Sequence, residues 1–224
     1  KQDDVTVPNT VVLEDGTVAD VTSIEDGAFK NTNIKKITIG DKIERIGEEA
    51  FSGCSELTTV KGGKNVIFIG KGAFANCTKL QKVHLGNQVG DINQRAFYNC
   101  VLLDSLILPN TVNTLGYNAF YNCKGLESVT IGNSITSIGL NAFGDCGNLT
   151  ATHYTGDIAD WCEIQFGTFD ANPVHHSHNL YINNKELKDL VIPNGVDSIH
   201  NYAFAECSSL NSVTIPNTVK SIEY

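Results

Sequence analysis

One pattern of apolar and polar positions returns at a nearly fixed interval along most of the chain. In its clearest form it contains the dipeptide Ala119-Phe120, then Cys123, then an alternating Val-Thr-Ile segment at 129–131. Apolar-polar-apolar alternation predicts a short, half-buried strand. A Pro-Asn or Gly-Asn pair follows most of these segments and predicts a turn. The Ala-Phe-x-x-Cys segment is too short for a full helix, so we expect a single turn of 3₁₀- or α-helix there.

The Ala-Phe dipeptide marks the repeat most clearly. It begins at seven alanines: Ala28, Ala50, Ala73, Ala96, Ala119, Ala142 and Ala203. A fixed period in the twenties predicts a solenoid, in which each coil buries its apolar side against its neighbours. Each of the seven phenylalanines holds the same place in its coil, so we expect their rings to form one continuous column in the core.

The last copy of the repeat carries a specific signature. It reads Ser198-Ile199-x-x-x-Ala203-Phe204-x-x-Cys207-Ser208-Ser209-Leu210-x-Ser212-Val213-Thr214-Ile215-Pro216-Asn217. This pattern resembles the BspA-type leucine-rich-repeat family of bacterial and protist surface proteins, and similar copies cover nearly the whole chain. The resemblance implies a leucine-rich-repeat solenoid of right-handed stacked coils, with a parallel sheet on one face and short turns or helical segments on the other. It also implies a secreted or cell-surface location and adhesion to host proteins or other cells.

The regular repeat predicts one domain over residues 1–224, made of about eight coils. Its pattern breaks over residues 155–186, because the strand-forming leucines Leu149 and Leu187 stand much further apart than one repeat period. Insertions within repeat proteins are often functional. The resembling family often shows a Trp-Cys segment followed by a hairpin at this point, which favours a recurrent structural variant.

The irregular stretch itself is expected to fold as an enlarged coil. The spacing of its apolar residues predicts a short helix over 158–164. Two further apolar runs, at 180–182 and 187–192, are predicted to form a hairpin through Asn183 and Asn184, because asparagine accepts positive φ.

Composition and charge exclude several classes of partner. The formal net charge is −9 at pH 7 and the 16 basic residues are scattered, which argues against nucleic acid and against an anionic membrane surface. No apolar stretch approaches the ~20 residues of a membrane span. The chain opens at Lys1 without a signal peptide and is expected to be a mature or trimmed form of an extracellular protein.

The seven cysteines do not predict a disulfide framework. Six of them hold one position of the repeat, four residues after alanine, and only Cys162 lies outside it. An odd number locked to the repeat favours a column of small, buried, reduced thiols. No cofactor is expected.

The irregular stretch contains residues for two possible chemical sites. His175, His176 and His178 are candidates for binding Zn²⁺ or Ni²⁺, with His153 or Cys162 as further ligands. Adjacent histidines project differently and no standard zinc spacing is present, so their spacing alone predicts no metal site.

The second possibility is a hydrolase. Cys162 with a histidine and Asp160 would imitate a Cys-His hydrolase, but only if the thiol is exposed. The family resemblance supplies no catalytic residues, and we expect no enzyme.

The exposed face of the sheet is the predicted binding surface, because alternate strand residues point outward. By register, the outward residues are Thr38, Lys61, His84, Ile107, Thr130, His153, Val191 and Thr214. Extended solenoid faces bind proteins or glycans over a large area. We therefore expect an adhesin-like, non-catalytic module whose partners are proteins or glycans of a host or a neighbouring cell. The alternative is a passive spacer that displays other domains. The sequence leaves the ligand and the oligomeric state open.

Overall fold

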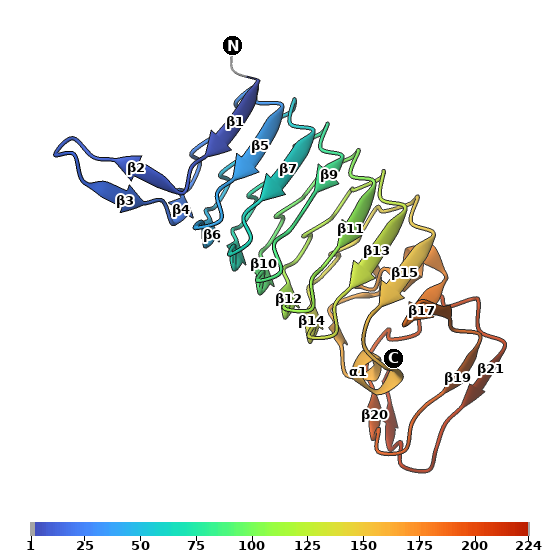
Figure 1. Ribbon diagram of the computed structural model, residues 1–224. Coiled ribbons are helices and arrows are strands. Elements are labelled where there is room, and N and C mark those ends of the chain that lie inside the picture. The colour runs from blue at the N-terminus through green and yellow to red at the C-terminus, as the bar shows by residue number, and fades with distance from the viewer. Residues whose placement is uncertain (1–2, 224) are drawn as a thin grey trace.

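The computed structural model describes residues 3–223 and shows an elongated stack of parallel coils (Figure 1). This architecture confirms the predicted solenoid. The predicted domain limits, Lys1 and Tyr224, lie outside the described residues. The longest helix in the described part of the chain has five residues, so no helix there has the length or the apolar character needed to cross a bilayer.

The alternating segments form the front of the stack, as predicted. They build one four-stranded parallel sheet from β1 (Asp4–Val7), β5 (Lys36–Ile39), β7 (Thr59–Gly62) and β9 (Lys82–Val83). They build a second sheet from β11 (Ser105–Ile107), β13 (Ser128–Ile131), β15 (Ala151–Tyr154), β17 (Leu180–Ile182) and β18 (Lys185–Glu186). In the regular coils the strands pair at one repeat spacing, so residues of the same repeat position lie side by side, as Val129 and Leu106 do.

A further sheet of two-residue strands runs along a second side of the stack. Its strands are β4 (Ser23–Ile24), β6 (Arg45–Ile46), β8 (Phe68–Ile69), β10 (Asp91–Ile92), β12 (Thr114–Leu115), β14 (Ser137–Ile138) and β16 (Gln165–Phe166). Sequence alternation does not predict this sheet, because two residues are too few to show a period. Each strand buries its apolar second residue against the core, as Ile138 does.

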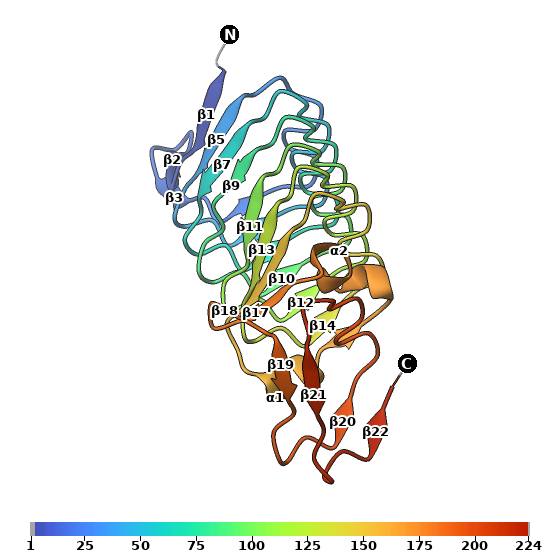
Figure 2. The same ribbon diagram turned by 90° about the vertical axis from the view of Figure 1, so that its right-hand side faces the viewer.

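The third side of the stack consists of tight turns, which project opposite the front sheet in Figure 2. The expected 3₁₀ or α-helical turn does not form over the Ala-Phe-x-x-Cys segments. The reason is the left-handed backbone at two positions of each turn, illustrated by Asn118 with φ of 56° and Asn122 with φ of 60°. Asparagine tolerates this region better than most residues. The turns are tied together between coils, because Phe97 N–H donates to the Ala119 carbonyl at 2.8 Å.

A column of aromatic rings fills the centre of the stack. Six phenylalanine rings stack with centroids 5.1–5.5 Å apart, from one coil to the next: Phe29, Phe51, Phe74, Phe97, Phe120 and Phe143. The prediction of seven rings was wrong by one. Phe143 N–H donates to Asp170 O, so Asp170 takes the place of the repeat alanine and Ala171 that of the next phenylalanine. Within the described residues, Phe204 is only half-buried and stacks on no ring of the column.

The cysteines form the predicted column of buried thiols. All seven are free and buried. Each thiol in the regular coils donates a hydrogen bond to a phenylalanine carbonyl of the preceding coil, with Cys100 Sγ 3.2 Å from Phe74 O and Cys123 Sγ 3.3 Å from Phe97 O. Cysteine therefore combines a small apolar side chain with a weak donor for a buried backbone acceptor.

The irregular stretch adds residues before β16 and again at the hairpin of β17 and β18, after which the repeat resumes. Leu115 pairs with Ile138, one regular repeat further on, whereas Ile138 pairs with Phe166, which lies more than one regular repeat further on. The extra residues before β16 form helix α1 (Ile158–Cys162), whose N-terminus is capped by the Asp157 carboxylate. The predicted helix is therefore confirmed, although it ends at residue 162. A 3₁₀ turn, η1 (Phe169–Ala171), and helix α2 (Val174–Ser177) replace the tight turn of a regular coil.

The predicted hairpin has a different second strand. Asn183 and Asn184 both have positive φ, at 49° and 63°, and they connect β17 to β18 rather than to the run at 187–192. That run contributes β19 (Asp189–Val191), which pairs with β21 (Ser212–Thr214), while β20 (Ser198–Ile199) pairs with β22 (Ser221–Ile222). These two small sheets lie beyond α1 at the C-terminal end (Figure 1). Antiparallel β18 covers the edge of β17, so the front sheet ends there.

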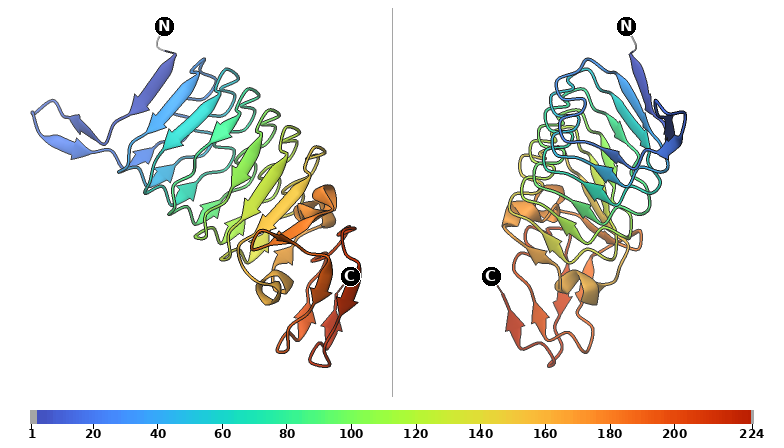
Figure 3. Two further views of the ribbon diagram at one scale, coloured as in Figure 1. Left: turned by 45° about the vertical axis from the view of Figure 1, so that its right-hand side comes forward. Right: turned by 90° about the vertical axis from the view of Figure 1, so that its left-hand side faces the viewer.

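A second hairpin projects sideways from the N-terminal coil (Figure 3, left). It consists of β2 (Thr10–Val12) and β3 (Val18–Asp20), which pair antiparallel. Its valines Val12 and Val18 are 73% and 68% exposed.

Candidate functional site

The predicted outward residues of the front sheets fall into three groups. Thr38 and Lys61 lie side by side on β5 and β7, and His84 directly follows β9. Ile107, Thr130 and His153 lie side by side on β11, β13 and β15. We call this row from Thr38 to His153 the strand face.

Val191 and Thr214 are paired with each other on the separate sheet of β19 and β21. They are therefore not part of the same row. The neighbour of His153 is instead Tyr181 on β17, and the two rings stack with centroids 4.7 Å apart. To predict Tyr181, the sequence would have had to show the longer distance between strands in the enlarged coil. The apolar pattern of that coil is irregular, so it does not show this distance.

The strand face changes in chemical character along the stack. At its N-terminal half the strand face carries Lys61, and Lys82 lies in the adjacent outward row on β9. Both lysines are exposed, and neither forms an ion pair with any residue in the range 3–223. Ile107 at the centre is 70% exposed, more than most large apolar side chains of the protein. The C-terminal half carries Thr130 and the stacked rings of His153 and Tyr181.

A shallow depression interrupts the strand face at its centre. The ladder of strand pairs stops between β9 and β11, and a cavity of about 240 Å³ lies there. Val83, His84 and Leu85 line one side, and Ser105, Ile107 and Pro109 line the other. The most exposed apolar residue of the face therefore borders a depression that also carries an imidazole.

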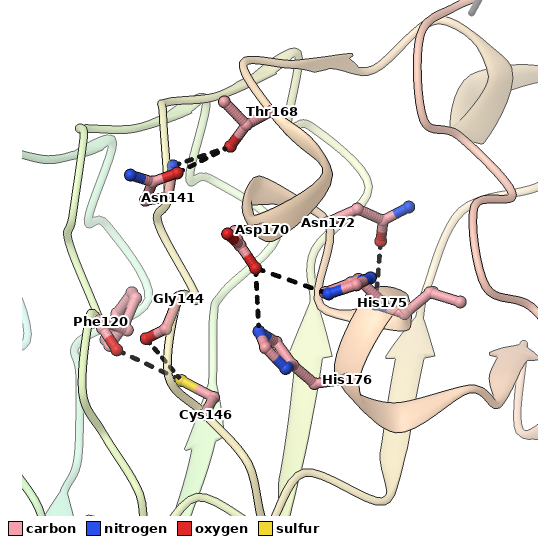
Figure 4. A network of polar contacts seen from close by, with 10 residues as sticks. Phe120, Asn141, Gly144, Cys146, Thr168, Asp170, Asn172, His175 and His176 are labelled. Atoms are coloured by element: carbon pink, nitrogen blue, oxygen red, sulfur yellow. Dashed lines mark hydrogen bonds and ion pairs between the residues drawn. The ribbon is translucent and has the colours of Figure 1, made fainter.

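Two of the three candidate histidines of the irregular coil lie close together, and the third does not. Figure 4 shows His175 and His176 of α2 pointing toward the carboxylate of Asp170 on η1. The Asp170 Oδ1 lies 3.6 Å from Nε2 of each ring. His178 points elsewhere, with Nδ1 3.1 Å from the carbonyl oxygen of Glu206. The sequence analysis missed Asp170, since nothing in the spacing marks one aspartate among many.

Burial affects the protonation of one histidine in this cluster. The pKa of His176 is lowered, because burial and the neighbouring His175 outweigh the attraction of Asp170 and Asp145 for its proton. The ring is therefore neutral at pH 7. Neutral imidazole is the form that binds metal ions.

The hydrolase hypothesis fails on the position of Cys162. This residue is fully buried, and burial followed by the charge of Glu163 raises the pKa of its thiol to about 12. A thiol in this state supplies almost no thiolate, which is the nucleophilic form. Trp161 beside it is also fully buried and belongs to the core.

We expect iodoacetamide to leave the cysteines of the native protein unmodified near neutral pH, and to modify all seven after denaturation. The reason is burial, which also raises the pKa of Cys146 to about 12. Intact-mass spectrometry before and after denaturation measures the number of adducts. Rapid modification of Cys162 in the folded protein would contradict its burial.

The fold and the strand face define a leucine-rich-repeat protein. The model of the BspA-type leucine-rich repeat region matches residues 22–150 and 176–224 in six copies. The chain therefore belongs to the BspA-type leucine-rich-repeat family, as its sequence pattern indicated.

Two solved structures illustrate the similarity. A leucine-rich cell surface protein of Faecalibacterium prausnitzii is 27% identical over 99% of this chain, with a TM-score of 0.62. This chain spans 65% of the length of that protein. A leucine-rich repeat protein of T. pallidum is 21% identical over 99% of this chain and 73% of its own length, with a TM-score of 0.48. No curated protein matches the chain.

Proposed function

We propose that this chain is a non-catalytic binding module of the cell surface or the extracellular space, which recognises protein or glycan ligands through its strand face. A solenoid of this family is a binding or structural module. A location at the cell surface is supported by the similarity to the F. prausnitzii protein, which is described as a cell surface protein.

The observation that carries the proposal is the composition of the strand face. Ile107 stands 70% exposed beside the central depression, where a ligand would bury it. A few well-packed side chains near the centre of an interface carry most of the binding energy, while the surrounding residues exclude water. The ammonium groups of Lys61 and Lys82 favour acidic groups of a ligand at the N-terminal half, despite the net charge of −9.

The test begins with a binding screen of the purified chain against host matrix proteins and glycans. We expect Ile107→Ala to weaken a ligand found in this way about tenfold, or ~1.4 kcal/mol, with smaller losses for His84→Ala and Thr130→Ala. Surface plasmon resonance with the immobilised ligand measures the affinity of each variant.

Ile67→Ala is the matched control. Ile67 is also an exposed isoleucine, at 52%, but it lies before β8 on the second side of the stack. Equal losses from Ile67→Ala and Ile107→Ala would contradict the strand face as the contact surface. A chain that binds nothing in the screen would favour the passive spacer.

A further inference from the structure

We propose that Asp170, His175 and His176 bind one divalent transition-metal ion of the Zn²⁺ type. The three residues offer one carboxylate oxygen and two imidazole nitrogens, all within 4.8 Å of one another. Two histidines and one carboxylate are a donor set that Zn²⁺ and similar borderline cations prefer, and three protein ligands leave a coordination position open.

The distances fit a shared ion better than they fit hydrogen bonds. Oδ1 of Asp170 lies 3.6 Å from Nε2 of His175 and 3.6 Å from Nε2 of His176. Both separations are too long for a hydrogen bond. Two ligand atoms on a tetrahedral zinc ion lie about 3.4 Å apart, given bond lengths near 2.0–2.1 Å. A shift of a few tenths of an ångström therefore brings the two Asp170 separations to that spacing, and all three ligand atoms already lie within 4.8 Å of one another.

An unsatisfied nitrogen atom points to the same conclusion. Nε2 of His176 is buried and has no hydrogen-bond partner among the residues that the structure describes. Buried polar atoms without partners are uncommon in folded proteins and are often explained by an ion or a water molecule that the coordinates lack. A metal ion supplies the missing partner of His176 Nε2 directly.

The backbone holds the three ligands in place. Asp170 is fixed to the preceding coil because its carbonyl oxygen accepts the N–H of Phe143 at 3.1 Å. Asn172, between the aspartate and the histidines, is buried, and its side-chain NH₂ donates to the carbonyl oxygens of Tyr202 and Ala203 at 2.8 and 3.1 Å. The backbone that carries the three ligands is therefore anchored to the coils on both sides, which favours binding.

The position of the cluster suggests what the ion does. Here Ala171 interrupts the phenylalanine column, and a short helix replaces the tight turn of a regular coil. An ion that links η1 to α2 would stabilise the coil that lacks its aromatic ring.

Cys146 is not among the proposed ligands, although it lies near Asp170 (Figure 4). Its thiol donates to the Phe120 carbonyl at 3.3 Å, and burial raises its pKa to about 12. Cys146 is also not among the side chains whose ligand atoms lie within 4.8 Å of one another. The proposed donor set therefore contains nitrogen and oxygen but no sulfur.

The experiment uses the whole chain without an affinity tag of histidines, after removal of metal with a chelator. Titration with ZnCl₂ in a calorimeter near neutral pH is expected to show one ion per chain. Zinc at a free concentration a hundredfold above its dissociation constant is expected to raise the melting temperature by about 5–10 °C. Replacement by Co²⁺ is expected to give visible absorption bands without the near-ultraviolet band of a cobalt-thiolate bond.

Variants assign the ligands. His176→Ala and Asp170→Asn are expected to lower the affinity for Zn²⁺ at least about 100-fold. His178→Ala is the matched control, because this histidine belongs to the same segment but points away from Asp170. The affinity of this variant for Zn²⁺ is expected to equal that of the native chain. The emission spectrum of the buried Trp161 reports whether each variant has folded.

Two results would overturn the proposal. One is the absence of stoichiometric Zn²⁺ binding by the native chain. The other is an equal loss of affinity in His178→Ala and His176→Ala. The proposal stands apart from ligand binding by the strand face, so Ile107→Ala is expected to bind Zn²⁺ as tightly as the native chain.

Discussion

Replacing Phe97 with alanine is expected to lower the free energy of unfolding by roughly 3–5 kcal/mol. The ring is fully buried and stacks on Phe74 at 5.1 Å and on Phe120 at 5.2 Å. Its removal leaves a cavity in a core that cannot collapse easily, because coils on both sides are held by the hydrogen-bonded ladders between turns. Lost ring stacking adds to the effect.

The consequence is large because stability in a solenoid is approximately a sum over coils and their interfaces. Phe97 takes part in two interfaces, so the change weakens the stack on both sides. Chemical denaturation followed by circular dichroism measures the loss. Ile107→Ala on the strand face serves as the control and is expected to change stability by less than about 0.5 kcal/mol.

A comparison within the phenylalanines sharpens this test. Phe204 is half-buried and lies outside the column, so Phe204→Ala is expected to cost less than Phe97→Ala. Equal costs for the two variants would show that the continuous column contributes nothing beyond the burial of single rings.

Replacing Trp161 with alanine is expected to have a similarly large cost, about 3–5 kcal/mol, concentrated at the C-terminal coils. Trp161 is fully buried, packs edge-on against Tyr154 at 5.1 Å, and lies 5.5 Å from Phe166. Its indole N–H donates to the carbonyl oxygen of Ala203 at 2.7 Å. One side chain therefore joins the enlarged coil to the coil that follows it.

The front sheet ends at β18, so side-chain contacts of this kind take over the role of the strand ladder at the junction. We expect amides of residues 187–223 to exchange faster with solvent in Trp161→Ala, while amides of the N-terminal coils keep their protection. Hydrogen-exchange mass spectrometry resolves the two regions. A uniform increase along the chain would contradict a local role of Trp161.

Trp161→Phe separates packing from hydrogen bonding at the same position. The Ala203 carbonyl also accepts the side-chain N–H of Asn172 at 3.1 Å, so it keeps one donor when the indole is lost. We therefore expect Trp161→Phe to cost much less than Trp161→Ala. The cost of losing one hydrogen bond with the acceptor still satisfied is about 1 kcal/mol.

The cysteines and asparagines of the repeat show which properties the sequence pattern predicts and which it does not. Cysteine at one position of each coil was correctly predicted to be buried and reduced. The thiol-to-carbonyl hydrogen bond was not predictable, because it joins a residue to the preceding coil and depends on their relative placement. The side-chain hydrogen bonds of the asparagines at the left-handed positions were not predictable for the same reason. For example, the Asn122 side-chain N–H donates to the Asn99 side-chain oxygen of the preceding coil at 2.6 Å.

By itself the sequence determined the solenoid, its regular coil length and the residues that line its core. These properties are repeated and local, so each copy carries the same information about backbone conformation and burial. Only the tertiary structure decided that Tyr181 rather than Val191 continues the strand face, and that Asp170 meets His175 and His176. The first fact depends on the short helix α1 and on the hairpin at Asn183, which change the strand spacing where the sequence repeat is interrupted. The second depends on η1 and α2, which replace the tight turn of a regular coil.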